Sequence, residues 1–486
     1  MAGYKNLFKQ TFIYGLATVL PRALSIILVP LYVSTLEKSE YGIYASLFAF
    51  IIFGNVILSY GMETAYFRFL HRKDEDPKKV ESTSLTSLTV TSLLFLLVAL
   101  PNVDFIARIL EYNPEYIRYT IWILALDALV VIPFSWFRAR EKPMRYAVLR
   151  IANVFINLSL NLFFFLLLPK LASQSPGSFW DGIYHPDNLI SYVFISNIVA
   201  SALTLGIVSP LYFKIGFSLD VAIWKRMLRY AMPILLAGIA FSINEALDKI
   251  LLKYLLPPDI ADSEVGVYAA CYKLGVFMTL FATAFRLGVE PFFFKQAEEK
   301  NAPIVYATVT KYFTLLGSLI FLAVMVYIDV FKVILITDES YWVAMGIVPI
   351  ILLANLFLGI YHNLSVWYKI TDNTKVGAYI SIVGALLTIV GNYLLIPHLS
   401  YYGSALATLL AYGAMMLLSY LFGQKYYPIP YPIKEILVYL LVSTAFSFLA
   451  FYIFGGSLLL GTLLLGLYAG LLLFMERSLV LQLIKR

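Results

Sequence analysis

The chain has 486 residues, of which 61% are apolar and only 13% are charged, and its formal net charge is +7. Ordinary soluble domains are about one-quarter charged, so this composition excludes a disordered chain, a basic nucleic-acid-binding protein and a typical soluble enzyme. A polytopic membrane protein remains, and its positive charge must be analysed by position along the chain. The single cysteine, Cys271, excludes an internal disulfide and a cysteine-based metal cluster.

Apolar stretches of about 20 residues, long enough to cross a bilayer, recur along the whole chain. They predict an all-α polytopic membrane protein with about fourteen transmembrane helices. In chain order the predicted spans are 10–35, 41–67, 83–101, 118–138, 146–169, 189–213, 227–254, 265–292, 304–328, 342–367, 376–396, 402–423, 434–454 and 457–475. The first run continues to full membrane length without a cleavage site, so we expect it to stay inserted.

The Lys and Arg residues are divided unequally between the two sets of loops that these spans define. One set holds 26 of them and the opposite set holds 6. We call the membrane face with the 26 residues the basic side. Because cytoplasmic loops are enriched in Lys and Arg, this bias predicts that both termini are cytoplasmic. The bias also supports the number of spans, since a missed span would move every later loop to the opposite side of the membrane.

A short motif occurs twice, as Glu40-Tyr-Gly-Ile-Tyr-Ala45 after the first span and Glu264-Val-Gly-Val-Tyr-Ala269 after the seventh. Six spans separate the copies, so both face the same side of the membrane. This predicts a parallel repeat with a pseudo-two-fold axis along the membrane normal, with chance similarity as the alternative. The glycine of each copy, like that of a weaker copy at 402–405, is expected to permit a tight loop before the next helix.

The repeat predicts three parts of the chain. Residues 1–213 would form a first six-helix lobe, 214–423 a second six-helix lobe, and 424–486 two additional C-terminal helices. The joint between the lobes is expected at 214–225, where Ser218 or Asp220 could cap an amphipathic segment.

Four basic residues lie inside the predicted spans, where a charge at the helix centre costs about 2.5–3.5 kcal/mol. They are Arg22, Lys249, Lys273 and Arg286. Such residues persist where they face water, an acid or an anionic cargo. Arg22 and Lys273 have no acid close by on their own spans, which makes them the stronger candidates for contacting an anionic cargo.

The other two cations have acids on their own helices. Lys249 follows Glu245 by four residues and Asp248 by one, which predicts a charge network that neutralises itself and fixes helix packing, or one that also contacts cargo. Arg286 precedes Glu290 by four residues, a spacing that suits an ion pair on one helix face, and Arg286 is also a candidate for contacting the cargo.

An acid and a polar stripe complete the set of candidates. Asp127 is isolated in the fourth span, where it could neutralise Arg22, carry a coupling proton or be a buried protonated acid. Asn153, Asn157 and Asn161 follow each other at intervals of four on one helix face. This stripe suits a cavity wall that binds sugar hydroxyls, and it equally suits hydrogen bonds between helices, the commoner use of Asn in membranes.

Catalytic motifs typical of soluble enzymes are missing from the sequence. It contains no HExxH, GxSxG or Walker A motif, and its four histidines have no metal-ligand spacing. We therefore expect no cofactor, no bound metal and no ATP site, so that gradients or a partner would supply any driving force.

Several segments together resemble a known family. They are Pro21-Arg22, Pro30-Leu-Tyr, the two repeated motifs, Met232-Pro233, Asp248-Lys249, Tyr272-Lys273-Leu-Gly275 and Glu290-Pro-Phe-Phe-Phe294. They are similar to those of Wzx-type oligosaccharide flippases, polysaccharide transporters of the superfamily that also holds lipid II flippases and multidrug exporters. The resemblance implies a V-shaped fold of two lobes that works by alternating access. It further implies a cationic central cavity onto which Arg22, Lys249 and Lys273 map.

The resulting hypothesis is a flippase of the bacterial inner membrane, not an enzyme. Its cargo would be undecaprenyl-diphosphate-linked oligosaccharide, moved from the cytoplasmic to the periplasmic leaflet for O-antigen, capsule or exopolysaccharide synthesis. Expected partners are membrane lipids, a polysaccharide polymerase and other assembly proteins, but no nucleic acid; a proton or sodium ion for coupling stays open. The alternatives are a drug or cation exporter with an acidic cavity, and a glycan polymerase or acyltransferase using His362 or His398.

Overall fold

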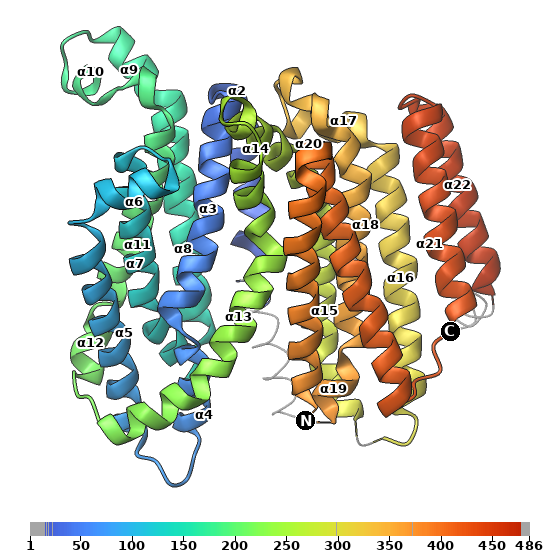
Figure 1. Ribbon diagram of the computed structural model, residues 1–486, viewed down its shortest axis with the longest axis horizontal. Coiled ribbons are helices and arrows are strands. Elements are labelled where there is room, and N and C mark those ends of the chain that lie inside the picture. Colours follow the sequence, from blue (N-terminus) through green and yellow to red (C-terminus); the bar gives the residue numbers. More distant parts are fainter. Residues whose placement is uncertain are drawn as a thin grey trace. The chain divides into compact units, whose positions relative to one another are not determined.

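The structure, a computed structural model, describes residues 15, 17, 19–21, 23–297, 299–371 and 373–477, with backbone only at 291, 294 and 295 (Figure 1). The chain forms two compact units, Met1–Gly266 (unit 1) and Val267–Arg486 (unit 2). We describe each unit by itself.

Both units are built from helices. Those of unit 1 are α2 (Leu28–Thr35), α3 (Lys38–Ser59), α4 (Met62–Leu70), α5 (Pro77–Ala99), α6 (Val103–Leu110), α7 (Pro114–Ala139), α8 (Pro143–Leu162), α9 (Leu168–Gln174), α10 (Phe179–Ile183), α11 (Ile190–Val208), α12 (Pro210–Ile215) and α13 (Val221–Leu255). The unit boundary falls within α14 (Pro258–Tyr272). Those of unit 2 are α15 (Val276–Gln296), α16 (Ala302–Val326), α17 (Ile328–Leu335), α18 (Val348–Leu364), α19 (Val366–Ile370), α20 (Thr374–Tyr426), α21 (Ile433–Phe448) and α22 (Leu458–Met475).

The prediction of about fourteen spans is confirmed. Eleven stretches of described helix are long and apolar enough to cross a membrane. One of them, α20, has 53 residues and is about 80 Å long, twice what a single crossing needs. Ser400, with φ 48° and ψ −134°, divides it into two spans. The 35-residue α13 and the apolar helix Val19–Thr35 supply the remaining two.

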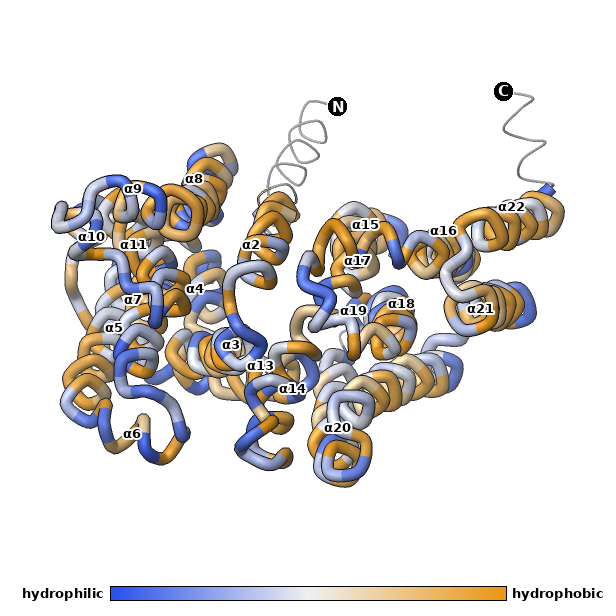
Figure 2. The backbone as a smooth tube through the Cα atoms, turned by 90° about the horizontal axis from the view of Figure 1, so that it is seen from above, coloured by the Kyte–Doolittle hydropathy of each residue, from blue (hydrophilic) through white to orange (hydrophobic). Residues whose placement is uncertain are grey.

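Burial separates central helices from helices that face lipid. In α7 the most apolar window is 72% buried, because α3, α5 and α11 all pack against this helix. In α22, whose backbone is mostly orange in Figure 2, the corresponding value is 17%, so most of its apolar residues are not buried in the protein. A helix that is apolar yet so little buried is stable only in lipid, which agrees with a multi-pass membrane protein.

The unit boundary lies elsewhere than the lobe boundary that the repeat predicts at 213/214. α13 packs against α3, α4 and α5, so it belongs to unit 1 by its contacts. At its start, Asp220 accepts hydrogen bonds from the backbone N–H groups of Ala222 and Ile223, which confirms one of the two expected helix caps. Those bonds, with nearby Lys79, hold the pKa of Asp220 below its usual value. The division into two six-helix lobes stays a prediction.

The glycines of the two repeated motifs meet each other within unit 1. Gly42 lies in the first turns of α3 and Gly266 lies in α14, so neither forms the tight loop that the sequence led us to expect. A Cβ atom at Gly42 would overlap the carbonyl oxygen of Asp262, and one at Gly266 would overlap the carbonyl oxygen of Lys38. Asp262 lies four residues before Gly266, and Lys38 lies four residues before Gly42. This reciprocity is what a local two-fold relation between the motif copies produces, and small residues allow such close helix crossings in membranes.

A buried carboxylate holds the two C-terminal helices of unit 2 against α16. Glu476, just after α22, accepts a hydrogen bond from Tyr439 of α21 at 2.6 Å, and Lys311 of α16 lies 2.5 Å from the same oxygen. Apolar residues of the same three helices pack beside this contact. Burial raises the pKa of Glu476, but the hydrogen bonds from Lys311 and Tyr439 outweigh burial and leave the pKa below its usual value.

The glycine contact predicts that Gly42→Ala lowers the thermal stability of the purified protein. The added methyl group has no room without a backbone shift, and overpacking of this kind costs about 1–3 kcal/mol. The matched control is Gly206→Ala in α11, where a Cβ atom meets nothing within 4 Å. Equal melting temperatures for the two variants in detergent would contradict the close approach of α3 and α14.

The Glu476 contact predicts a loss that depends on pH. Glu476→Gln should destabilise the protein by about 2 kcal/mol at neutral pH, because Lys311 loses its charged acceptor. The pKa of Glu476 is lower in the folded than in the unfolded protein, so the ionised contact stabilises the fold above the unfolded pKa near 4.5. That contribution is lost as pH falls through the folded pKa. Thermal melts from neutral to acid pH should therefore bring wild type and variant together, whereas the exposed Glu299→Gln should match wild type throughout.

Candidate functional site

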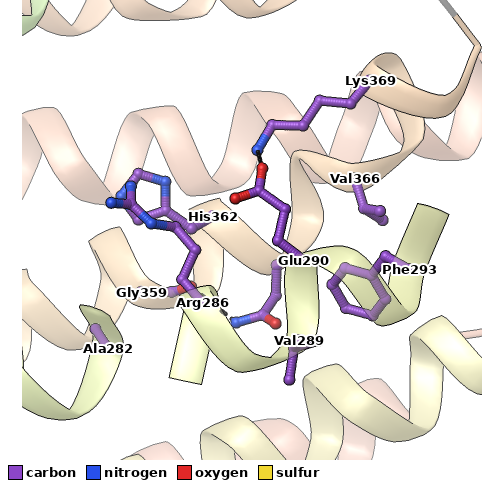
Figure 3. A pocket seen from close by; sticks show the side chains of 10 residues that line it. Ala282, Arg286, Val289, Glu290, Phe293, Gly359, His362, Val366 and Lys369 are labelled. Atoms are coloured by element: carbon purple, nitrogen blue, oxygen red, sulfur yellow. Dashed lines mark hydrogen bonds and ion pairs between the residues drawn. The ribbon is translucent and has the colours of Figure 1, made fainter. Parts of the chain in front are cut away.

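A pocket in unit 2 brings together ionisable residues from α15, α18 and α19 (Figure 3). α15 supplies Arg286 and Glu290, which lie one turn apart, α18 supplies His362, and α19 supplies Lys369. The chain turns at Ser365 between α18 and α19, and both helices contact α15. This turn is what carries Lys369 to the side of the pocket that Glu290 faces.

The charges in this pocket are paired differently from the prediction. Lys369 Nζ lies 2.7 Å from Glu290 Oε1, so Glu290 bonds across to α19 and the expected pair with Arg286 does not form. Arg286 points the other way and lies beside His362 (Figure 3). Among the residues that the structure describes, none forms a hydrogen bond or an ion pair with the Arg286 guanidinium. Lys369 and Glu290 compensate each other, so Arg286 leaves the pocket with one uncompensated positive charge.

The size of the pocket limits what it can hold. Its volume is about 20 Å³, enough for about one water molecule. Besides the ionisable residues, its lining consists of Asn363 and of apolar residues such as Val289 and Phe293. A ligand could thus place only a small polar group against Arg286. A guanidinium offers a fork of N–H donors that matches a phosphate or a carboxylate, so an oxyanion is the group best suited to this position.

The candidate residues of α13 form a neutralised pair in unit 1. Lys249 Nζ lies 3.0 Å from Asp248 Oδ1, and the two side chains are only 16% and 5% exposed. Glu245, the other predicted partner, has an exposed side chain and takes no part in that contact. Lys249 therefore has its charge compensated by the neighbouring residue, which supports the self-neutralising interpretation, while contact with cargo stays a prediction.

The structure says less about the other two predicted cations, Lys273 and Arg22. Lys273 is partly buried and begins the 3₁₀ turn Lys273–Gly275, which joins α14 to α15. Arg22 lies outside the described residues. The convergence of Arg22, Lys249 and Lys273 on one central cavity therefore stays a prediction.

The asparagine stripe of α8 is used largely for helix packing. Asn153 donates a hydrogen bond to Thr204 Oγ1 of α11 at 3.0 Å. Asn161 is fully buried, accepts a hydrogen bond from the Tyr32 hydroxyl of α2 at 2.8 Å and donates to the Asn157 carbonyl at 2.8 Å. For Asn153 and Asn161 the geometry supports contacts between helices. Asn157, which is partly exposed, keeps its place as a candidate for cargo contact.

Asp127 of α7 lies at a junction of three helices in unit 1. Its Oδ1 accepts a hydrogen bond from the Ser201 hydroxyl of α11 at 3.0 Å, and its Oδ2 accepts one from the Asn55 amide of α3 at 3.3 Å. Both donors are neutral, and Arg150 acts on the carboxylate only at longer range. The site can hold a carboxylate or a carboxylic acid in the same geometry, so both the coupling and the structural roles of Asp127 stay open as predictions.

Sequence reasoning missed the position of His362 beside Arg286 and the role of Lys369. Lys369 was counted only among the basic loop residues that set the orientation. Its distance of seven residues from His362 was the available signal, since side chains two helical turns apart lie on the same face. The chain turns between them, yet both still line one pocket.

A double-mutant cycle tests whether the stripe stabilises packing. Tyr32→Phe and Asn161→Leu should each lower the melting temperature, and the two effects should be coupled by about 0.6–1.7 kcal/mol, because each removes the same buried hydrogen bond. Asn157→Leu is the control on the same face, and we expect it to change stability less. Additive effects of the first two substitutions would exclude the Tyr32–Asn161 bond as a stabilising contact.

Solved membrane transporters share this fold. The lipid II flippase MurJ in an inward closed conformation matches with a TM-score of 0.73 and 16% identity, over 96% of this chain and 100% of that one. An inward-facing multidrug resistance MATE family transporter matches with a TM-score of 0.62 and 16% identity, over 83% of this chain and 93% of that one. The eukaryotic MATE transporter AtDTX14 matches with a TM-score of 0.58 and 14% identity, over 90% and 99%. At these identities the likeness concerns the fold alone.

Sequence comparisons point to a family. The family model described as MatE matches residues 229–394. A search of curated proteins gave no match. The family model described as polysaccharide biosynthesis protein matches residues 7–295, more than half of the chain, and so this chain belongs to the polysaccharide biosynthesis protein family.

Proposed function

We propose that this membrane protein is a flippase for undecaprenyl-diphosphate-linked oligosaccharide. It would move this cargo from the cytoplasmic to the periplasmic leaflet of a bacterial inner membrane by alternating access, with both termini in the cytoplasm. Family membership over residues 7–295 and the fold shared with a lipid II flippase support transport of a lipid-linked sugar. The uncompensated charge of Arg286 is the observation that supports a diphosphate as part of the cargo.

The pocket of Arg286 suits the charged part of such a cargo rather than its sugars. A phosphate oxygen fits the small enclosed space, whereas the glycan and the lipid chain would stay outside it. Arg286 is ten residues, or about 15 Å along the helix, from the end of α15 that leads to the basic side. A diphosphate that enters from the cytoplasmic leaflet would therefore meet this guanidinium inside the membrane.

The membrane potential supplies a driving force that needs no nucleotide. With an inside-negative potential, outward movement of an anion is favoured by about 2.3 kcal/mol per charge per 100 mV. A diphosphate that keeps its negative charge inside the protein would gain this term during export. Antiport of a proton through Asp127, or of sodium, is the competing source, and imposed gradients distinguish them.

A drug or cation exporter is the second candidate function. The MatE family model covers residues 229–394 and several MATE transporters share the fold. A cationic cargo requires an acid that faces it, and Asp127 with its neutral donors is the described residue that could take this role. The charge of the Arg286 pocket favours the anionic cargo over this alternative.

The Arg286 proposal predicts a transport defect without a folding defect. In proteoliposomes with a fluorescent lipid-linked oligosaccharide, Arg286→Gln should weaken cargo binding about tenfold to a hundredfold, since a charged hydrogen bond contributes about 1.5–3 kcal/mol. Arg286→Lys should recover part of the activity. Arg118→Gln, an exposed position near the opposite membrane face, is the matched control and should transport normally.

The same assay separates the alternatives. Normal transport by Arg286→Gln at limiting cargo concentration would remove the phosphate assignment. Export of a cationic dye that depends on Asp127, with no movement of the lipid-linked sugar, would favour the drug exporter. A change in the mass of the lipid-linked sugar after incubation would favour a polymerase or an acyltransferase.

A further inference from the structure

Three basic side chains of unit 1 converge on one indole ring at the basic side of the membrane. Lys142 Nζ lies 4.8 Å from the centroid of the Trp136 ring, Lys214 Nζ lies 5.0 Å from it, and the Arg140 guanidinium carbon lies 5.8 Å from it. We call these four residues the Trp136 cluster. Its members come from the end of α7, the turn before α8, and the last turn of α12. Neither these contacts nor the cluster belongs to the cargo site proposed above.

The local backbone directs these side chains to the same place. After α7 the chain reverses at Glu141, which has a positive φ of 50°, and the backbone N–H of Lys142 donates to the carbonyl of Phe137 at 2.9 Å. This tight turn folds Lys142 back over Trp136. Lys214 arrives from α12, whose residues Leu211 and Ile215 pack in the same apolar cluster as the indole.

The charges of the cluster are only partly compensated. Arg140 is paired with Glu81, whose carboxylate oxygen lies 2.6 Å from the guanidinium. Among the residues that the structure describes, no carboxylate lies within ion-pair distance of Lys142 or Lys214. Cations that approach one indole ring this closely repel one another. Partial burial, together with the positive charges of Arg145, Lys214 and Arg140, lowers the pKa of Lys142. An anion placed among them would relieve this repulsion.

The surroundings of the cluster fit a lipid better than a free ion. Beside Lys214, Phe213 is 84% exposed, and Phe217 after α12 is 57% exposed. On α8, two residues after Lys142, Met144 is 58% exposed. Bulky apolar side chains next to cations at a membrane edge bind acyl chains and phosphate together, and basic pockets between transmembrane helices bind anionic lipid headgroups.

We propose that the Trp136 cluster is a binding site for an anionic phospholipid of the leaflet on the basic side. The lipid phosphate would lie between Lys142 and Lys214, with Arg140 at its edge, and the acyl chains would run along Phe213 and Met144. The charge of the phosphate holds the ends of α7, α8 and α12 together, where the three helices otherwise present like charges to one another. This site is independent of which cargo the protein transports.

Native mass spectrometry of the full-length protein, released from mixed micelles that contain phosphatidylglycerol or phosphatidylcholine, tests the proposal. Wild type should retain phosphatidylglycerol in preference to phosphatidylcholine. In Lys142→Gln/Lys214→Gln this preference should fall about thirtyfold, because each basic residue contributes about 1 kcal/mol to binding of an anionic lipid. Lys73→Gln/Lys78→Gln removes the same charge from exposed positions of another loop that the orientation places on the same side, and its preference should stay within about twofold of wild type.

The outcomes decide between the site and its rivals. Equal losses in the two double variants would show a general attraction of anionic lipid to the basic side and would overturn the proposal. No loss in either would overturn it as well. Displacement of phosphatidylglycerol by millimolar inorganic phosphate would show a free-phosphate site instead of a lipid site, and preferential retention of undecaprenyl diphosphate with the same sensitivity would assign the cluster to the cargo. Melting temperatures confirm that each variant is folded, since all four substitutions replace partly or fully exposed lysines.

Discussion

The bilayer offers no water to a buried charge, and this constraint explains where the ionisable side chains of this protein lie. Several lysines inside or at the ends of spans lie against a carboxylate. The pairs are Lys249 with Asp248, Lys253 with Asp262, Lys311 with Glu476, and Lys369 with Glu290. Each pair satisfies a charge, and the last three pairs also tie two parts of the chain together. Arg286 departs from this pattern, because the acid on its own helix bonds to Lys369 instead.

Helix packing follows the same constraint, because lipid provides no hydrophobic driving force for helices to associate. Contacts between helices depend instead on small residues and on hydrogen bonds between side chains. Gly42 and Gly266 allow α3 and α14 to approach at their backbones, while Tyr32 and Asn161 join α2 to α8. In the asparagine stripe, which suits a cavity wall and helix packing equally, Asn153 and Asn161 form hydrogen bonds to neighbouring helices.

The spans could be predicted from the sequence because each depends only on a local run of apolar residues of membrane length. Partners could not be predicted in the same way, because they depend on which helices become neighbours. The spacing of Arg286 and Glu290 indicated an ion pair, but Glu290 forms its ion pair with Lys369 of α19. The glycine in each repeated motif was recognised as special, yet its reason, a close helix crossing rather than a loop, needs the two copies to be placed side by side.

The Trp136 cluster could not be predicted from the sequence either, because counting basic residues in loops does not show which of them lie close together. Arg140, Lys142 and Lys214 each contribute to the orientation bias as single loop residues, where any position near the membrane surface would serve. Orientation alone gives no reason for three of them to approach one indole ring, since like charges repel at that distance. Contact with the indole offsets part of this repulsion, and an anion among the cations would relieve more of it, which is the physical basis of the lipid site proposed above. The Arg286 pocket follows the same reasoning, with its phosphate expected from cargo rather than from the surrounding lipid.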